Sequence, residues 1–201
     1  SIQTLSLKDV SFSYPNGEEA VLKNIDFSCH KGQKIAVIGS TGSGKSTLVK
    51  LMNRFYDVSR GSIEINGVDI RKDDLESLRA QIGYVAQKAH MFKGSIKSNI
   101  CFGKPEASDE EMHHAARVAQ ASDFISKREN GYLDEIAEDG TNISGGQKQR
   151  LSIARVILKK PSLYIYDDSF SALDFKTDKD LRMKLKEIEN MTIFLISQRT
   201  S

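Results

Sequence analysis

The chain has 201 residues, of which 39% are hydrophobic, so it can bury a core as one domain with room for an inserted subdomain. Lys and Arg total 29 against 27 for Asp and Glu, and the formal net charge of +2 makes no case for a nucleic-acid partner or an anionic membrane surface. Cys29 and Cys101 are too few for a disulfide framework, which favours reduced thiols in the core. No apolar stretch approaches the length of a membrane span, so we expect any membrane role to come through a partner.

Short strand patterns dominate the residues up to 86. Apolar residues alternate with polar ones, or run continuously with β-branched members, in segments bounded by turn signals. The expected strands are 5–12, 25–29, 35–38, 63–65 and 82–85, with helices at 46–55 and 73–79, and with turns at 14–17 and 66–67. The continuous apolar run at 35–38 predicts a strand that is buried on both faces.

The middle of the chain changes to helix formers. Residues 109–119 and 144–157 are the clearest helical segments. After Pro161 the strand pattern returns at 163–166, and a helix over 175–189 and a strand over 192–196 follow. These patterns predict an α/β core, about residues 1–86 and 158–201, that carries an inserted helical subdomain over about 87–157.

A glycine-rich phosphate-binding pattern, GxxxxGK[ST], lies between the expected strand at 35–38 and the helix at 46–55, which is the context that supports it. It consists of Gly39, Ser40, Thr41, Gly42, Ser43, Gly44, Lys45 and Ser46, and Thr47 follows in the same helix start. The glycines let backbone N–H groups converge on phosphate oxygens at a helix N-terminus. Lys45 supplies a positive charge to the β- and γ-phosphates, and the Ser46 hydroxyl can bind Mg²⁺.

A carboxylate ends a second apolar strand. Leu163 to Tyr166 run directly into Asp167, which this pattern places at the C-terminal edge of a parallel sheet, facing the Mg²⁺ shell. Taken alone, an aspartate that ends a strand is more commonly a cap or a turn residue. The phosphate loop upstream favours the metal role for Asp167.

The segment Ser144-Gly145-Gly146-Gln147 lies at the start of the helix expected over 144–157. Ser144 can cap that helix, and the two glycines would expose backbone N–H groups to an anion. The same residues equally fit an ordinary capping motif with flexible glycines.

In this order, the phosphate loop, the Ser144–Gln147 element and the apolar strand ending at Asp167 resemble the ATP-binding-cassette family, over nearly the whole chain. The resemblance implies a P-loop NTPase (RecA-like) core with an N-terminal antiparallel β-subdomain and an inserted α-helical subdomain. In that family the signature element of one domain closes over ATP held by the phosphate loop of another. It therefore implies ATP and Mg²⁺ as cofactors and a second such domain as partner, with both held at the cytoplasmic face of a membrane by transmembrane domains.

The resemblance also assigns weaker motifs. Tyr14 matches the aromatic residue that stacks on adenine, and Gln87 matches the glutamine that touches Mg²⁺ or water and couples to the membrane domains. Residues 171–174, ending at Asp174, resemble the segment that links the two ATP sites. Without the family, Tyr14 would be interpreted as packing, Gln87 as a solvated loop residue and Asp174 as a helix-start acid.

Two segments favour an exporter. Residues 92–100 and 134–140 resemble exporter domains, and the second resembles the contact with intracellular helices. A solvated acidic loop is the alternative for residues 134–140.

Two positions depart from the family pattern at the γ-phosphate. Asp168 stands where the family usually has the glutamate that polarises water, and Gln198 stands where it usually has histidine. Asp168, Gln198 and Lys45 are the expected catalytic residues, but a shorter carboxylate and an amide that cannot become cationic predict a slow chemical step. The resemblance then implies a heterodimeric exporter whose own site is weak; the alternatives are tolerated drift in a working enzyme and a trap variant.

Two rival functions remain open at this stage. The first is a cassette ATPase that acts on DNA or ribosomes, which we would expect to carry a coiled-coil insertion or a basic surface. The second is a nucleotide-sensing module, which would bind ATP without turnover. The chain ends soon after Gln198, earlier than the family normally runs, which predicts a fragment of a longer polypeptide with membrane helices.

Overall fold

The structure is a computed structural model that describes residues 1–17, 19–39 and 44–197. It divides the chain into two compact units, each formed by segments that are distant in sequence. Unit 1 comprises residues 1–83, 162–167 and 190–201, and unit 2 comprises residues 84–161 and 168–189.

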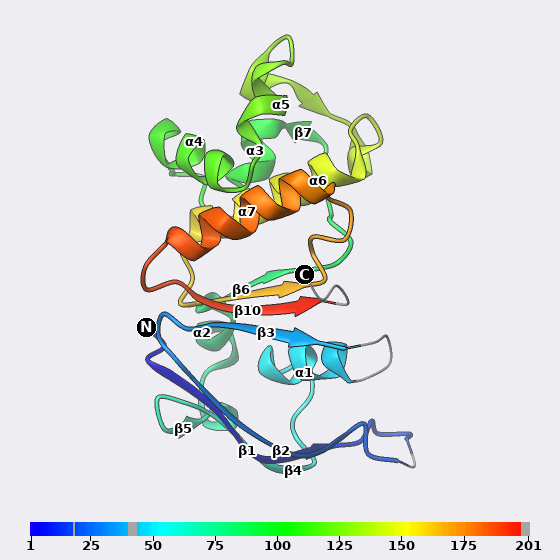
Figure 1. Cartoon of the computed structure of the whole chain (residues 1–201), viewed down its shortest axis with the longest axis vertical. Coiled ribbons are helices and arrows are strands. Elements are labelled where there is room, and N and C mark those ends of the chain that lie inside the picture. Colours follow the sequence, from blue (N-terminus) through cyan, green and yellow to red (C-terminus); the bar gives the residue numbers. More distant parts are fainter. Residues whose placement is uncertain (18, 40–43, 198–201) are drawn as a thin grey trace. The chain divides into compact units, whose positions relative to one another are not determined.

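Unit 1 contains an antiparallel sheet with the strand order β2-β1-β4-β5 (Figure 1). Its strands are β1 (Thr4–Phe12), β2 (Leu22–His30), β4 (Arg60–Ile65) and β5 (Val68–Asp69). The alternation expected for 5–12 is present, since Leu5, Leu7, Val10 and Phe12 are buried. The hairpin expected at Asn66-Gly67 is confirmed, because both residues have positive φ, 52° and 80°, as a type I′ turn requires.

The second sheet of unit 1 is parallel, in the order β3-β10-β9-β6. It contains β3 (Lys34–Ile38), β9 (Leu163–Asp167), β10 (Thr192–Ser197) and β6 (Ile82–Val85), whose last two residues belong to unit 2. β10 pairs in parallel with both β3 and β9, and the Phe27 ring of β2 meets the Phe194 ring of β10 at 5.3 Å. The two sheets of unit 1 therefore share apolar contacts.

The expected burial of β3 on both faces is wrong. Its residues alternate between exposed and half-buried, and Ile38 is 53% exposed. β3 stands at one end of the strand order, with β10 as its neighbour, so it lacks the cover that a central strand has. An apolar run shows that a strand can be buried, whereas its place in the sheet decides whether it is.

Helix α1 (Lys45–Met52) ends three residues before the sequence pattern suggested. Asn53 follows as a cap whose side-chain amide donates to the Val49 carbonyl at 3.0 Å, and Arg54 has a left-handed φ of 54°. The Arg79 guanidinium, on α2 (Leu75–Ala80), donates to the carbonyls of Asn53 and Arg54, each at 3.2 Å. The last carbonyls of α1 are satisfied locally, because the N–H groups of Arg54 and Phe55 donate to the carbonyls of Leu51 and Lys50 at 3.0 and 2.8 Å. A 3₁₀ turn, η1 (Ile70–Lys72), precedes α2.

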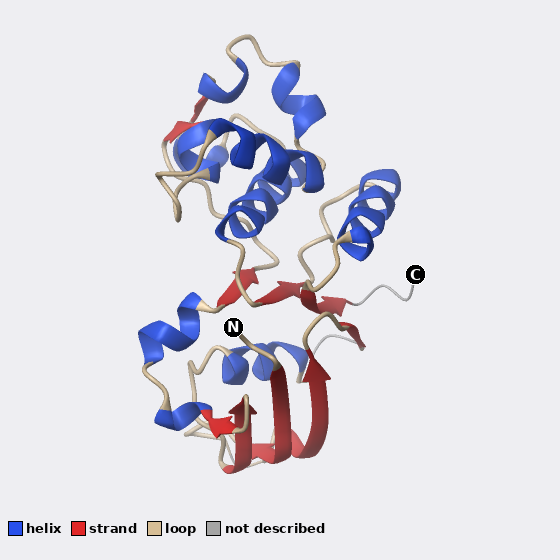
Figure 2. Cartoon of the chain, turned by 90° about the vertical axis from the view of Figure 1, so that its left-hand side faces the viewer, coloured by secondary structure: helices blue, strands red, loops and turns tan. Residues whose placement is uncertain are grey.

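Unit 2 is mainly helical, with a two-stranded ribbon (Figure 2). Its α-helices are α3 (Ile96–Ile100), α4 (Asp109–Val118), α5 (Ser122–Ser126), α6 (Gly145–Lys159) and α7 (Phe175–Glu187). The ribbon pairs β7 (Gly94–Ser95) with β8 (Glu135–Ile136), and η2 (Gly131–Leu133) and η3 (Glu138–Gly140) are 3₁₀ turns. α6 packs on α3 and α4, and its residues Leu151, Ile153 and Ala154 are fully buried.

Both cysteines are free and buried, as expected, and burial raises the pKa of each thiol. Among the helices that the structure describes, none is both long enough and apolar enough to cross a membrane.

Candidate functional site

The phosphate loop lies in unit 1, between β3 and α1. Gly44 has a φ of 89° and caps α1, and the backbone carbonyl of Gly39 accepts a hydrogen bond from the Lys45 ammonium. The same ammonium lies 3.5 Å from the carbonyl of Ser197, at the end of β10. Lys45 is therefore held at the carboxyl ends of β3 and β10. Ser40, Thr41, Gly42 and Ser43 lie outside the described residues, as does Gln198.

Asp167 ends β9 as the sequence predicted. It pairs in register with Ile196 of β10, whose next residue, Ser197, pairs with Ile38 of β3. The carboxyl ends of these three parallel strands thus share one edge of the sheet, and Gly39 follows β3 directly at that edge. Asp167 is half-buried there, and Ser46 is exposed in the first turn of α1.

Tyr14 and Thr47 contact each other in unit 1. The Tyr14 hydroxyl lies 2.9 Å from Thr47 Oγ1, and Thr47 is buried in α1. The Tyr14 ring meets Phe12 and Tyr56 edge-on, at 4.9 and 5.3 Å, and the Lys50 ammonium lies 5.7 Å from its centroid. This packing fixes the ring beside the first turns of α1.

The Ser144–Gln147 element begins α6 in unit 2. Ser144 Oγ accepts from the Gln147 N–H at 3.1 Å, and the Gln147 side chain accepts from the Ser144 N–H at 3.1 Å, which forms a capping box. The capping expected for Ser144 is therefore present. Gly145 and Gly146 lie in the first turn, where they carry no side chain over the backbone N–H groups.

The segment 171–174 lies against this helix start. A Cβ placed on Gly146 would stand 3.1 Å from the Ala172 carbonyl oxygen, so glycine permits the close approach. Asp174 caps α7, and its carboxylate accepts from the backbone N–H and hydroxyl of Thr177 at 2.8 and 2.9 Å. These two hydrogen bonds hold the pKa of Asp174 below its ordinary value.

Asp168 and Gln87 are brought together in unit 2. The Gln87 side-chain amide donates to Asp168 Oδ2 at 3.3 Å. Asp168 has a left-handed φ of 48°, a conformation that aspartate tolerates better than most residues. The neighbouring Ser169 is fully buried, and its hydroxyl donates to the Val85 carbonyl at 2.6 Å.

Sequence reasoning missed two residues of unit 2. The Gln149 amide, on α6, donates to the carbonyls of Ala86 and Gln87. Arg150 donates to the Gly146 carbonyl at 3.2 Å and to the Gln120 carbonyl at 3.0 Å, and burial lowers its pKa. The signal was available for Gln149, since it is a polar residue in the apolar periodic pattern of the helix.

The two exporter-like segments have ordered local structure. Asn99 exchanges hydrogen bonds with the backbone of Phe92 at 2.8 and 2.9 Å, and the exposed Phe92 and Phe102 rings stack at 4.3 Å. In the acidic segment, the Asp134 carboxylate pairs with Arg128 at 2.6 Å. Its residues 134–140 also include β8 and η3.

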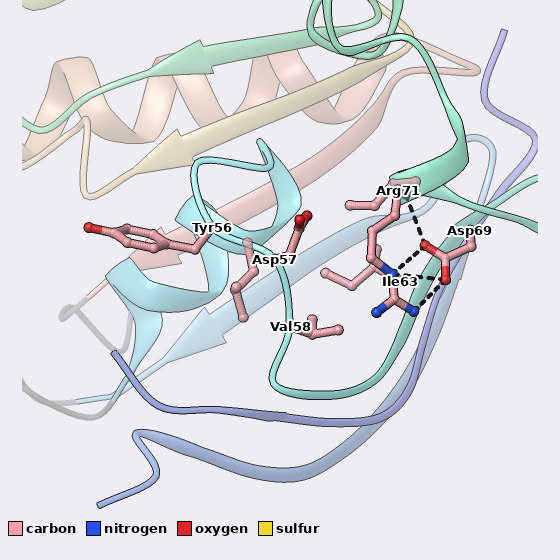
Figure 3. A pocket seen from close by; sticks show the side chains of 8 residues that line it. Tyr56, Asp57, Val58, Ile63, Asp69 and Arg71 are labelled. Atoms are coloured by element: carbon pink, nitrogen blue, oxygen red, sulfur yellow. Dashed lines mark hydrogen bonds and ion pairs between the residues drawn. The ribbon is translucent and has the colours of Figure 1, made fainter. Parts of the chain in front are cut away.

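A separate shallow pocket in unit 1 does not include any predicted site residue (Figure 3). It is lined by Leu51, Tyr56, Asp57, Val58, Ile63, Asp69, Ile70 and Arg71. The Arg71 guanidinium pairs with the Asp69 carboxylate at 2.6 Å and lowers its pKa, so these two charges satisfy each other.

Comparison with known proteins gives the family. The family model described as ABC transporter matches residues 22–171. The ATP-dependent lipid A-core flippase of Vibrio parahaemolyticus is 42% identical over 98% of this chain, and the matched part is 34% of the flippase. Heavy metal tolerance factor 1 of Caenorhabditis elegans is 42% identical over 98% of this chain and 25% of its own length.

A solved structure, that of a bacterial Atm1-family ABC exporter with ATP bound, superposes with a TM-score of 0.92 at 35% sequence identity. The match covers 99% of this chain and 35% of the exporter chain, so this chain spans about a third of that length. The match includes the mixed α/β arrangement of an antiparallel and a parallel sheet. The chain therefore belongs to the ABC transporter family, as an ATPase domain of that family.

Proposed function

We propose that this chain is the nucleotide-binding domain of an ABC exporter, in which ATP binding closes a pair of such domains and hydrolysis reopens it. The support is that the chain is similar along almost its whole length to a flippase and to an ATP-bound exporter, each about three times as long. The remainder of such a polypeptide would supply the transmembrane domains. These would hold the chain at the cytoplasmic face of a membrane.

The phosphate loop would bind the nucleotide as its magnesium complex. The candidate ligands are the Ser46 hydroxyl, the Asp167 carboxylate and the Gln87 side chain, and oxygen donors of this kind suit Mg²⁺. Lys45 would neutralise phosphate charge, and bound Mg²⁺ would stabilise the charge that develops on the phosphates. The backbone carbonyls that now hold the Lys45 ammonium keep it beside the phosphate loop.

The observation that carries the weak-site proposal is the state of Asp168. Its side chain is one methylene shorter than the family's usual glutamate, and one carboxylate oxygen is already hydrogen-bonded to the Gln87 amide. A general base must reach its water within hydrogen-bond distance, and a displacement of about 1 Å can cost about a hundredfold in rate. We infer slow turnover at the site that Asp168 serves.

The signature element keeps the active pattern of the family. Ser144, Gly145 and Gly146 would complete the ATP site of the partner domain, with residues 171–174 beside them. A weak site on this chain and a complete signature element together favour a partner of different sequence, which makes a heterodimer.

The test compares Mg²⁺-ATP binding and turnover of the native chain and of the double variant Asp168→Glu with Gln198→His. Protein concentrations are chosen so that domains pair. The proposal expects the native chain to bind ATP with slow turnover, and the double variant to hydrolyse at least about tenfold faster. Brisk hydrolysis by the native chain would instead identify Asp168 as a sufficient base in an ordinary homodimer. ATP binding without turnover in both proteins would favour a nucleotide-sensing module.

A further inference from the structure

Gln149 is a buried polar side chain on α6 to which the site described above gives no role. It is 2% exposed and lies about one helical turn beyond Gly145, on the same buried helix face as Ile153 and Ile157. Burying an amide costs free energy unless hydrogen bonds replace those made to water. An apolar residue would fill this position without that cost, so the contacts of Gln149 need a reason.

The amide nitrogen of Gln149 holds the backbone of the Gln87 loop. It donates to the carbonyl of Gln87 and, at 3.4 Å, to the carbonyl of Ala86. Its side-chain oxygen is buried and has no hydrogen-bond partner among the described residues. An unsatisfied buried acceptor is unfavourable, so the side chain keeps its donor contacts at the expense of its acceptor.

The same stretch of backbone is held from a second side. Ser169 donates to the carbonyl of Val85 at 2.6 Å, and Ser169 follows Asp168 directly in the chain. Successive carbonyls, from Val85 to Gln87, therefore accept hydrogen bonds from side chains on two different segments of unit 2. The Gln87 side chain leaves this held backbone and reaches Asp168 at 3.3 Å.

We propose that Gln149 is a positioning residue, which fixes the Gln87 amide against the Asp168 carboxylate through the backbone of residues 86–87. This inference rests on the proposed function, in which Asp168 orients the attacking water. Gln149 does not touch the nucleotide in this scheme. Its effect on hydrolysis passes through the loop that it holds.

The first test needs no nucleotide. Gln149→Met keeps the length and helix propensity of the side chain but removes the amide, and Ser152→Ala, on the buried side of the same helix, is the control. Hydrogen–deuterium exchange is followed over residues 84–92 in the nucleotide-free chain. We expect exchange about five- to tenfold faster in Gln149→Met, as the loss of one net hydrogen bond implies, and unchanged in the control. Equal exchange in the native chain and in Gln149→Met would overturn the proposal.

The second test separates positioning from stability. Gln149→Met, Gln87→Ala and both together are placed in the chain that carries Asp168→Glu and Gln198→His, in which the proposed function expects measurable turnover. We expect Gln149→Met to lower kcat about tenfold or more with KM within about threefold, and to add nothing to Gln87→Ala. Losses that add in full would show that Gln149 does not act through Gln87. If the loop loosens but no chain hydrolyses ATP, the proposed ATPase function fails while the positioning of the loop stands.

A second substitution covers the case in which Gln149→Met folds poorly. Gln149→Glu cannot donate when ionised but donates one hydrogen bond when protonated, and burial favours its protonated form. Exchange over residues 84–92, corrected for the intrinsic effect of pH, should therefore slow relative to the native chain as the pH falls. A constant ratio across the pH range would count against the proposal.

Discussion

The left-handed backbone at Asp168 leads to a prediction in which stability and activity change in opposite directions. A left-handed conformation costs an ordinary residue roughly 1–2 kcal/mol, and aspartate is one of the few that adopt it readily. Asp168 has a φ of 48°, so Asp168→Glu should lower the free energy of unfolding by about 1 kcal/mol, or a melting temperature by about 2–4 °C for a chain of this size. The longer side chain should at the same time raise turnover, by up to about a hundredfold.

Two matched variants test this reasoning by thermal unfolding and ATP turnover. Asp9 has the same φ of 48° in β1, so Asp9→Glu should lose a similar stability without gaining activity. Asp168→Asn keeps a residue that accepts the left-handed conformation, so it should keep its stability within about 0.5 kcal/mol while turnover falls. The reasoning is refuted if Asp168→Glu has the same melting temperature as the native chain while Asp9→Glu has a lower one. It is also refuted if Asp168→Glu leaves turnover unchanged.

The remaining predictions concern stability and the other site elements. The hydrogen bond from Lys104 lowers the pKa of Glu111 to about 2 from an ordinary 4.5. The ionised Glu111 side chain therefore stabilises the fold above pH 4.5, and this stabilisation is lost as the pH falls toward 2. In Glu111→Gln this part of the acid dependence of the unfolding midpoint should disappear. Gly145→Ala has room for its Cβ, because the nearest atom lies at 3.9 Å. The substitution should raise the free energy of unfolding, measured in urea, by about 0.5 kcal/mol. It should also lower turnover of the paired domains if this glycine faces ATP. Tyr14→Phe leaves the buried Thr47 hydroxyl without its partner and should cost about 1 kcal/mol in the same assay, with ATP affinity little changed if the ring alone meets adenine.

Local signals predicted much of this structure. Ser144 and Gln147 form a capping box within one helical turn, so the start of α6 is encoded by adjacent residues. The apolar run over 163–166 likewise predicted β9, which is buried through Tyr166 and extends one residue further, to Asp167. The turn at Asn66-Gly67 needed two positive φ values, which these residue types supply.

Features that depend on distant segments were not predictable. α1 ends at a left-handed Arg54, a residue type that does not signal this conformation, and the Arg79 guanidinium that holds the carbonyls of Asn53 and Arg54 comes from a distant segment. The exposure of β3 follows from its place in the strand order, which its own apolar run does not contain. The role of Gln149 depends on where the backbone of residues 86–87 passes, so sequence alone marks it as unusual without giving the reason.

Within unit 2, α6 carries residues that serve two different sites in the proposed dimer. Its first turn, with Ser144 and Gly145, would face ATP on the partner, while Gln149 holds the loop that presents Gln87 to this chain's Asp168. An α-helix rises about 1.5 Å per residue and is stiff over one turn, so a shift of its start moves Gln149 with it. If capture of ATP by the signature element shifts the start of α6 in the proposed dimer, the contact between Gln87 and Asp168 should change with it.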